Sequence, residues 1–294
     1  MKQWVSKSSG SDIAVLTAIL SSGNFIAGKV LVEVLSPINA IIVRFAIAIL
    51  IFFFVLDMSE FKKVTHRDAL ILFFSGLFGM TAYNLLFFNA ALSAPALNLA
   101  LINATIPVQT LIAAALVHRH IPSSQEILAF IVAFIGVLLV LTQGVFDANL
   151  FTLHKGELLM VAAASSWVLY GMLVQQLSRK FSSWLITFCS VLSGFLFLLP
   201  VALVQGLFEK LPHMQSPHWF VVFYMGIIGT TFSGTFYAVA VKKLGPSVAN
   251  VITFSSTPVF VGVLSYFIFG TPITQWHIVG GGLVICALML GLRK

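Results

Sequence analysis

Aromatic and amide side chains that could bind an organic solute recur inside long apolar runs of this sequence. Tyr83 and Phe87 are four residues apart and Trp167 and Tyr170 are three apart, so each pair lies on one face of a helix. Tyr and Trp usually collect at membrane interfaces, whereas these residues and Tyr237 lie well within their runs. We therefore expect a cavity with apolar walls and hydrogen-bonding tips, which suits an amphipathic organic solute. Its candidate residues are Asn24, Tyr83, Asn84, Phe87, Trp167, Tyr170 and Tyr237.

Two further apolar runs carry polar side chains in stripes. At about 100° per residue, the members of each stripe return to nearly the same helix face. Hydrogen bonding between helices and lining of a cavity both explain such stripes. The stripes are Asn98, Thr105 and Gln109 in one run and Asn250, Thr253 and Thr257 in the other, and we add Asn98, Asn103, Asn250 and Thr257 to the candidate substrate-binding residues.

Pro107 and Pro258 fall near the middle of the same two runs. A proline inside a helix removes one backbone donor and frees the carbonyl four residues earlier, here that of Asn103 and of Phe254. We expect helix kinks at both prolines, which make polar backbone available at the centre of the membrane. A kink kept only for packing is the alternative.

Few charged residues lie within the apolar runs. Arg44 lies about two turns into its helix, where it must reach outward to the interface, form an ion pair or face a wet cavity; a substrate carboxylate would be a suitable partner. Lys29 and Glu33 are one turn apart, which favours a local ion pair. No Asp or Glu occupies the middle of a run, so a buried-carboxylate relay for protons or sodium is not supported.

Motifs for catalysis or cofactor binding are absent from the sequence. It contains no nucleophile triad, no HExxH, no phosphate-binding loop and no dinucleotide glycine motif. Cys189 and Cys286 lie inside apolar runs without a partner at metal-ligand or disulfide spacing. We expect no catalytic residues, no metal and no cofactor.

The composition indicates that these residues belong to a membrane protein. Of the 294 residues, 59% are hydrophobic and 9% charged, and the mean hydropathy is +1.04, which excludes a soluble globule. The net charge of +7 does not indicate nucleic acid, because the bases lie in short loops between apolar runs. The lipid bilayer is therefore the expected partner of most of the surface.

The apolar runs have the length of membrane-spanning helices and lack the alternation of barrel strands. We predict an all-α integral membrane protein with ten transmembrane helices. They are placed at 12–32, 38–56, 69–91, 96–117, 125–143, 156–177, 183–205, 218–241, 247–269 and 273–292.

The two halves of the chain resemble each other. Gly76-Leu-Phe-Gly79 recurs as Gly226-Ile-Ile-Gly229, 226 − 76 = 150 residues later, and after one inserted residue Pro107 coincides with Pro258. Two five-helix repeats, residues 1–144 and 145–294, are the simplest interpretation. Because five is odd, the second repeat must lie inverted in the membrane.

Loop charges predict the orientation. With a cytoplasmic N-terminus, twelve Lys and Arg residues lie on the inside and only Lys29, Lys155 and Lys210 on the outside, as the positive-inside rule requires. The twelve are Lys2, Lys7, Lys62, Lys63, Arg67, Arg119, Arg179, Lys180, Lys242, Lys243, Arg293 and Lys294. Both termini are then cytoplasmic.

The chain resembles the drug/metabolite transporter superfamily in its EamA-type ten-helix branch. The similarity covers almost the whole length and is carried by Asn24-Phe25, by Pro37 followed by Arg44-Phe45, by Gly76-x-x-Gly79 and by the segments that end at Pro107 and Pro258. The resemblance implies a transporter of the bacterial inner membrane that exports amino acids, related metabolites or drugs from a central cavity.

We therefore expect a secondary-active transporter that exports a small organic metabolite by alternating access. A passive facilitator or channel and a non-transporting membrane sensor are the alternatives. A membrane enzyme would need clustered acids, histidines or nucleophiles at one membrane face, and the sequence shows none. A homodimer is left open.

Overall fold

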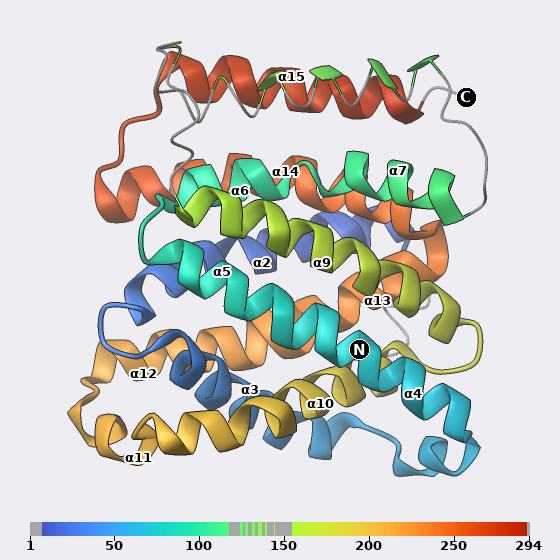
Figure 1. Ribbon diagram of the computed structural model, residues 1–294, viewed down its shortest axis with the longest axis vertical. Helices are drawn as coiled ribbons and strands as arrows, with labels where there is room; N and C mark the ends of the chain where they lie inside the picture. The colour runs from blue at the N-terminus through green and yellow to red at the C-terminus, as the bar shows by residue number, and fades with distance from the viewer. Residues whose placement is uncertain are drawn as a thin grey trace.

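The computed structural model describes residues 8–117 and 155–292, together with short stretches between 124 and 144. The described residues form helices that run side by side across the molecule, without any strand among them, and α15 (Gln275–Leu292) lies along one edge (Figure 1). The first-half elements are α2 (Gly10–Leu31), α3 (Pro37–Val55), η1 (Met58–Lys63), α4 (His66–Ser75), η2 (Gly76–Ala82), α5 (Tyr83–Ala91), α6 (Ala96–Asn103) and α7 (Ile106–Val117). The second-half elements before α15 are α9 (Lys155–Ser178), α10 (Ser183–Val204), α11 (Leu207–Lys210), η4 (Leu211–His213), α12 (Ser216–Phe223), η5 (Tyr224–Phe232), α13 (Ser233–Leu244) and α14 (Pro246–Phe269).

The fold class predicted from the sequence is confirmed: the protein is an all-helical membrane protein. In the described part of the chain, eight helices are long and apolar enough to cross a membrane. Together with α15, they match nine of the ten predicted segments to within three residues at each end. Most of the remaining segment, 125–143, lies outside the described residues.

Local sequence explains where the helices begin and end. Ser9 and Thr65 form capping boxes with Asp12 and Asp68, and Ser36 caps the helix that Pro37 opens. Gly245 lies between α13 and α14, and Gly270 follows the last residue of α14. Their φ angles of 78° and 64° suit glycine, which allows the chain to turn sharply at both ends of α14.

The regular hydrogen bonding of the helices is interrupted next to one of the two prolines and at two places that the prolines did not predict. The third and eighth predicted spans each contain a π-helical segment, η2 and η5, at the related sequences Gly76–Ala82 and Tyr224–Phe232. The fourth span divides between Asn103 and Ile106, directly before Pro107, which lies in the first turn of α7, where a proline is tolerated. α14 continues past Pro258 as one helix.

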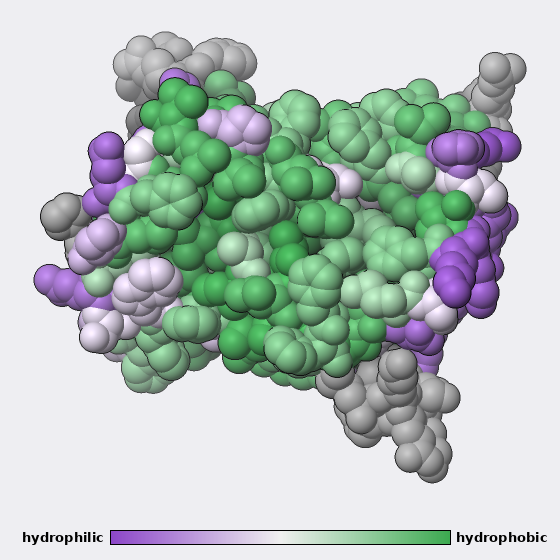
Figure 2. Space-filling model, turned by 90° about the horizontal axis from the view of Figure 1, so that it is seen from below, coloured by the Kyte–Doolittle hydropathy of each residue, from purple (hydrophilic) through white to green (hydrophobic). Residues whose placement is uncertain are grey.

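Polar side chains gather at the two ends of the helices, with an apolar band between them (Figure 2). Large apolar side chains such as Phe54 and Phe267 are exposed on the outside, 87% and 79% respectively, as expected for contact with lipid. At one end, Lys242 donates to the carbonyl of Phe181 at 3.5 Å and Lys243 to that of Ser8 at 2.7 Å. The loops that the charge pattern assigned to one membrane side therefore meet at one end of the bundle.

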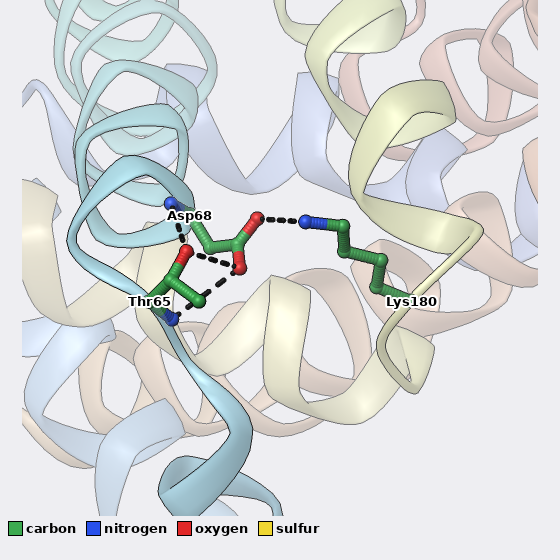
Figure 3. A network of polar contacts seen from close by, with 3 residues as sticks. All are labelled: Thr65, Asp68 and Lys180. Atoms are coloured by element: carbon green, nitrogen blue, oxygen red, sulfur yellow. Dashed lines mark hydrogen bonds and ion pairs between the residues drawn. The ribbon is translucent and has the colours of Figure 1, made fainter.

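The same end carries an ion pair between the two halves of the chain (Figure 3). Lys180, in the connection from α9 to α10, contacts Asp68 at the start of α4 at 2.8 Å. The other carboxylate oxygen of Asp68 accepts from the hydroxyl of Thr65 at 2.7 Å and from its backbone N–H at 3.3 Å. Nearby, the backbone N–H of Ser182 donates to Glu60 at 3.1 Å. These contacts hold the halves together at the polar surface.

The predicted ion pair between Lys29 and Glu33 is wrong. The ammonium group of Lys29 instead donates to the carbonyls of Ala91 and Ala94, at 2.7 and 3.3 Å. These carbonyls lie at and just beyond the end of α5, where the last turn has no partners of its own and the helix dipole is negative. Lys29 therefore ties the end of α2 to the end of α5.

Candidate functional site

A cavity lies between helices of both halves of the chain. Its walls border about 700 Å³ of space between atoms, a volume that includes open solvent. The first half lines it with Thr17, Ser21, Asn24, Phe25, Arg44, Met80, Tyr83, Asn84, Phe87 and Asn103. The second half lines it with Trp167, Gly229, Thr230, Ser233, Gly234, Tyr237, Thr253 and Phe254.

Eight of the twelve residues predicted to bind substrate line this cavity. They come from six helices, so only the tertiary fold brings them together. These eight are Asn24, Arg44, Tyr83, Asn84, Phe87, Asn103, Trp167 and Tyr237.

The other four predicted residues do not line the cavity. Asn250 lies one layer behind, where it accepts from the hydroxyl of Tyr237 and donates to Thr110, both at 2.8 Å. Tyr170 is fully buried beside Tyr237, and Thr257 donates to a carbonyl of its own helix. Asn98 lies near the end of the bundle opposite the Asp68–Lys180 pair.

The two prolines also lie outside this cavity. Pro107 is buried in α7, and Pro258 lines a separate apolar groove formed by α6, α14 and α15.

Trp167 occupies the centre of the aromatic wall. Its ring centroid lies 4.7 Å from that of Tyr83, 5.1 Å from that of Tyr237 and 6.2 Å from that of Phe254. Tyr83 is in turn stacked on Phe87, with an angle of 3° between the rings. The wall therefore spans helices from both halves and presents ring faces and polar tips to the cavity.

Arg44 faces the cavity rather than the lipid interface. It is buried, and its guanidinium lies over the rings of Phe45 and Phe88, 5.0 and 5.5 Å from their centroids. One terminal nitrogen donates to the side-chain oxygen of Asn84. The amide nitrogen of Asn84 donates to the carbonyls of Gly79 and Met80, at 3.3 and 2.7 Å, so the π-helical segment fixes the group that holds Arg44.

Several buried polar atoms of the lining residues have no hydrogen-bond partner in the structure. They are the side-chain oxygens of Asn24, Asn103 and Thr230, the Nε atom of Arg44 and the Nε1 atom of Trp167. Asn24 is held by its other end, since its amide nitrogen donates to the carbonyl of Gly229 at 3.3 Å. Buried polar groups are normally paired, so these atoms give the cavity unused capacity to bind a polar solute.

Small residues of the lining were not among the sequence candidates. Glycine, serine and threonine carry little chemistry by themselves, and nothing in one sequence distinguishes those that border a cavity from those that pack helices. The only signal was the paired glycine motif, which marks the close approach of η5 to Asn24. The ten lining residues outside the candidate set are Thr17, Ser21, Phe25, Met80, Gly229, Thr230, Ser233, Gly234, Thr253 and Phe254.

The glycine motifs make reciprocal contacts. A Cβ atom on Gly76 would lie 2.7 Å from the carbonyl oxygen of Ser190, and one on Gly226 would lie 3.0 Å from that of Arg44. Likewise, Gly79 packs on Tyr170, while Gly229 packs on Asn24. Ser190 follows Arg44 by 190 − 44 = 146 residues, and Tyr170 follows Asn24 by the same number. The glycine motif of each half therefore packs against corresponding positions of the other half.

Comparisons with known proteins agree with this fold. A solved crystal structure superimposes with a TM-score of 0.66 over 96% of both chains at 16% identity. An uncharacterized transporter of Bacillus subtilis, YyaM, is 25% identical over 92% of this chain and 90% of its own length. An uncharacterized transporter of Archaeoglobus fulgidus is 24% identical over 100% of this chain and 100% of its own length. An uncharacterized transporter of Bacillus subtilis, YetK, is 23% identical over 99% of this chain and 89% of its own length.

The apolar helices and the relatives define the class: this is a multi-pass membrane transporter. The model of the EamA-like transporter family matches residues 9–142 and 154–293. The chain therefore belongs to the EamA-like transporter family, as the resemblance indicated.

Proposed function

We propose that this protein is a secondary-active transporter that exports small amphipathic organic metabolites, the class that includes amino acids, by alternating access of the central cavity. The observation that carries this proposal is the cavity itself, which combines an aromatic wall with unpaired polar atoms and is lined from both halves of the chain. Such a site binds a solute that is apolar on one side and polar on the other. We propose transport rather than catalysis.

We further propose that residues 1–144 and 145–294 are inverted repeats that rock about the cavity. The reciprocal glycine contacts and the two π-helical segments support this division, because paired surfaces of that kind are expected when related units pack across a two-fold axis. The bases at the end of the bundle that contains Lys62 and Lys243 favour a cytoplasmic location for this end and for both termini, in a bacterial inner membrane.

A flux experiment tests the transport proposal. Proteoliposomes containing the purified protein are loaded with a panel of labelled metabolites, with and without a pH gradient. We expect saturable efflux that is accelerated by unlabelled solute on the opposite side. Linear flux without this acceleration would identify a channel or passive facilitator, and no flux of any solute would favour the membrane sensor.

Labelling of single cysteines tests the inverted orientation. In a background of Cys189→Ser and Cys286→Ser, a membrane-impermeant maleimide added to intact cells should label Glu33→Cys and Gln205→Cys, since these exposed positions adjoin the predicted outer loops. Lys62→Cys and Lys243→Cys should react only after the cells are opened. Reaction of these last two positions from opposite sides would refute the inverted repeats.

A further inference from the structure

The cavity contains a single ionised side chain. Arg44 is the only Lys, Arg, Asp or Glu among the described lining residues. A guanidinium keeps its charge in proteins even when buried. The neutral amide of Asn84 and the two phenyl rings attract this charge but do not cancel it.

No acidic residue in the described part of the chain forms an ion pair with Arg44. Each of these acids lies at a helix end or in a connection, away from the middle of the spans. They are Asp12 and Glu33 at the ends of α2, Asp57 and Glu60 at η1, Asp68 at the start of α4, Glu157 at the start of α9 and Glu209 in α11. An unpaired charge in a low-dielectric site is costly, so an anionic group on the solute would stabilise Arg44.

Building on the proposed transport function, we propose that the preferred solute is an organic monoanion, whose carboxylate binds the guanidinium of Arg44. A monoanion makes the loaded cavity electrically neutral. A zwitterion such as an amino acid leaves one positive charge uncompensated, and a cation leaves two. The proposal therefore selects carboxylic acids without an amino group from the wider class of amphipathic metabolites.

The rest of the cavity matches such a solute. The side-chain oxygens of Asn24 and Asn103 lack donors, and as neutral amides they can accept from a hydroxyl group but cannot neutralise an ammonium. The wall around Trp167 accommodates an apolar or aromatic body. Asn84, held by two carbonyls of the π-helical segment, orients Arg44 so that its Nε atom stays available.

Matched compounds test the charge requirement. Phenyllactate, phenylalanine and phenylalaninamide share a ring and a chain length and carry net charges of −1, 0 and +1 at about pH 6, below the range in which an α-amino group titrates. Their binding to the protein in lipid nanodiscs is measured by calorimetry, beside 2-hydroxy-4-methylpentanoate and leucine as an aliphatic pair. We expect each hydroxy acid to bind about tenfold or more tightly than its amino acid, the difference expected for a charged contact. Chloride and inorganic phosphate are titrated as simple anions and should bind more weakly.

Four variants separate the role of Arg44 from a folding defect. Arg44→Gln should weaken hydroxy-acid binding about tenfold or more, and Arg44→Lys should weaken it less. Asn103→Asp adds a carboxylate to the cavity at nearly constant size and should shift the preference toward phenylalanine. Lys62→Gln removes one positive charge from the exposed polar end and should leave the preference unchanged.

The outcomes distinguish this inference from the proposed function. Amino acids that bind as tightly as the hydroxy acids, chloride that binds as tightly, or no binding by either hydroxy acid would overturn the monoanion assignment. Flux of zwitterions without preference for anions would do the same and leave the transport function intact. Preferential binding of the hydroxy acids without any flux would support the assignment and reject the transport function.

Discussion

Trp167→Ala is expected to reduce transport by about tenfold or more while the protein still inserts into the membrane. The indole contacts Tyr83, Tyr237 and Phe254 across the two halves of the chain, and each aromatic pair contributes about 0.5–1.5 kcal/mol beyond its buried area. Removal of the ring therefore loosens the wall against which the solute packs. Initial rates of counterflow in proteoliposomes, together with the thermal midpoint of the purified variant, measure both effects.

The chain offers a matched control for this variant. Trp219 lies in α12, half-buried beside Phe223 and outside the cavity lining. Trp219→Ala removes the same volume near the membrane edge and should keep most of the flux. Trp167→Phe retains an aromatic face and should be intermediate. Wild-type rates for Trp167→Ala would exclude this residue from the binding site.

Gly79→Ala is expected to lower the thermal stability of the protein, although it adds only one methyl group. The new Cβ atom would overlap two ring carbons of Tyr170, which is fully buried and packed against Trp167 and Tyr237. The ring has little room to retreat, and overpacking of this kind costs about 1–3 kcal/mol. The thermal midpoint in detergent should fall clearly below that of the wild type.

Gly282→Ala provides the comparison for this change. It makes the same substitution within α15, where an added Cβ atom meets no other atom within 4 Å. Alanine also favours the helix over glycine by about 1 kcal/mol, so the midpoint should stay the same or rise slightly. Equal midpoints for Gly79→Ala and the wild type would mean that the packing between η2 and α9 is looser than described.

The sequence was sufficient to predict the membrane helices, because their length and apolarity are properties of each segment alone. The aromatic residues of the cavity, such as Trp167 and Tyr237, could also be identified, since polar-tipped rings far from the interface require an explanation. Asn98 and Asn250 were placed in the cavity because helical spacing shows that residues share a face, but not which neighbour that face meets. Asn250 meets Tyr237 and Thr110, which satisfy its amide.

Only one of the helix interruptions could be located from residue type. The fourth span divides directly before Pro107, whereas α14 continues past Pro258 as one helix. The π-helical segments coincide with the glycine motifs, where the chain closely approaches other helices. The contacted residues lie about one hundred positions away for η2 and about two hundred for η5, so a local pattern does not reveal them.

The reciprocal glycine contacts have a consequence for the origin of this architecture. The two halves contact each other through equivalent surface patches. Identical molecules form two-fold symmetric dimers through interfaces of the same kind. Under the inverted-repeat arrangement proposed above, a shorter ancestral chain with one set of five spans would already have possessed both faces required to assemble with an inverted copy of itself. Fusion of two such genes would then preserve the assembly, and afterwards each copy could acquire its own side chains, as Arg44 and Ser190 illustrate.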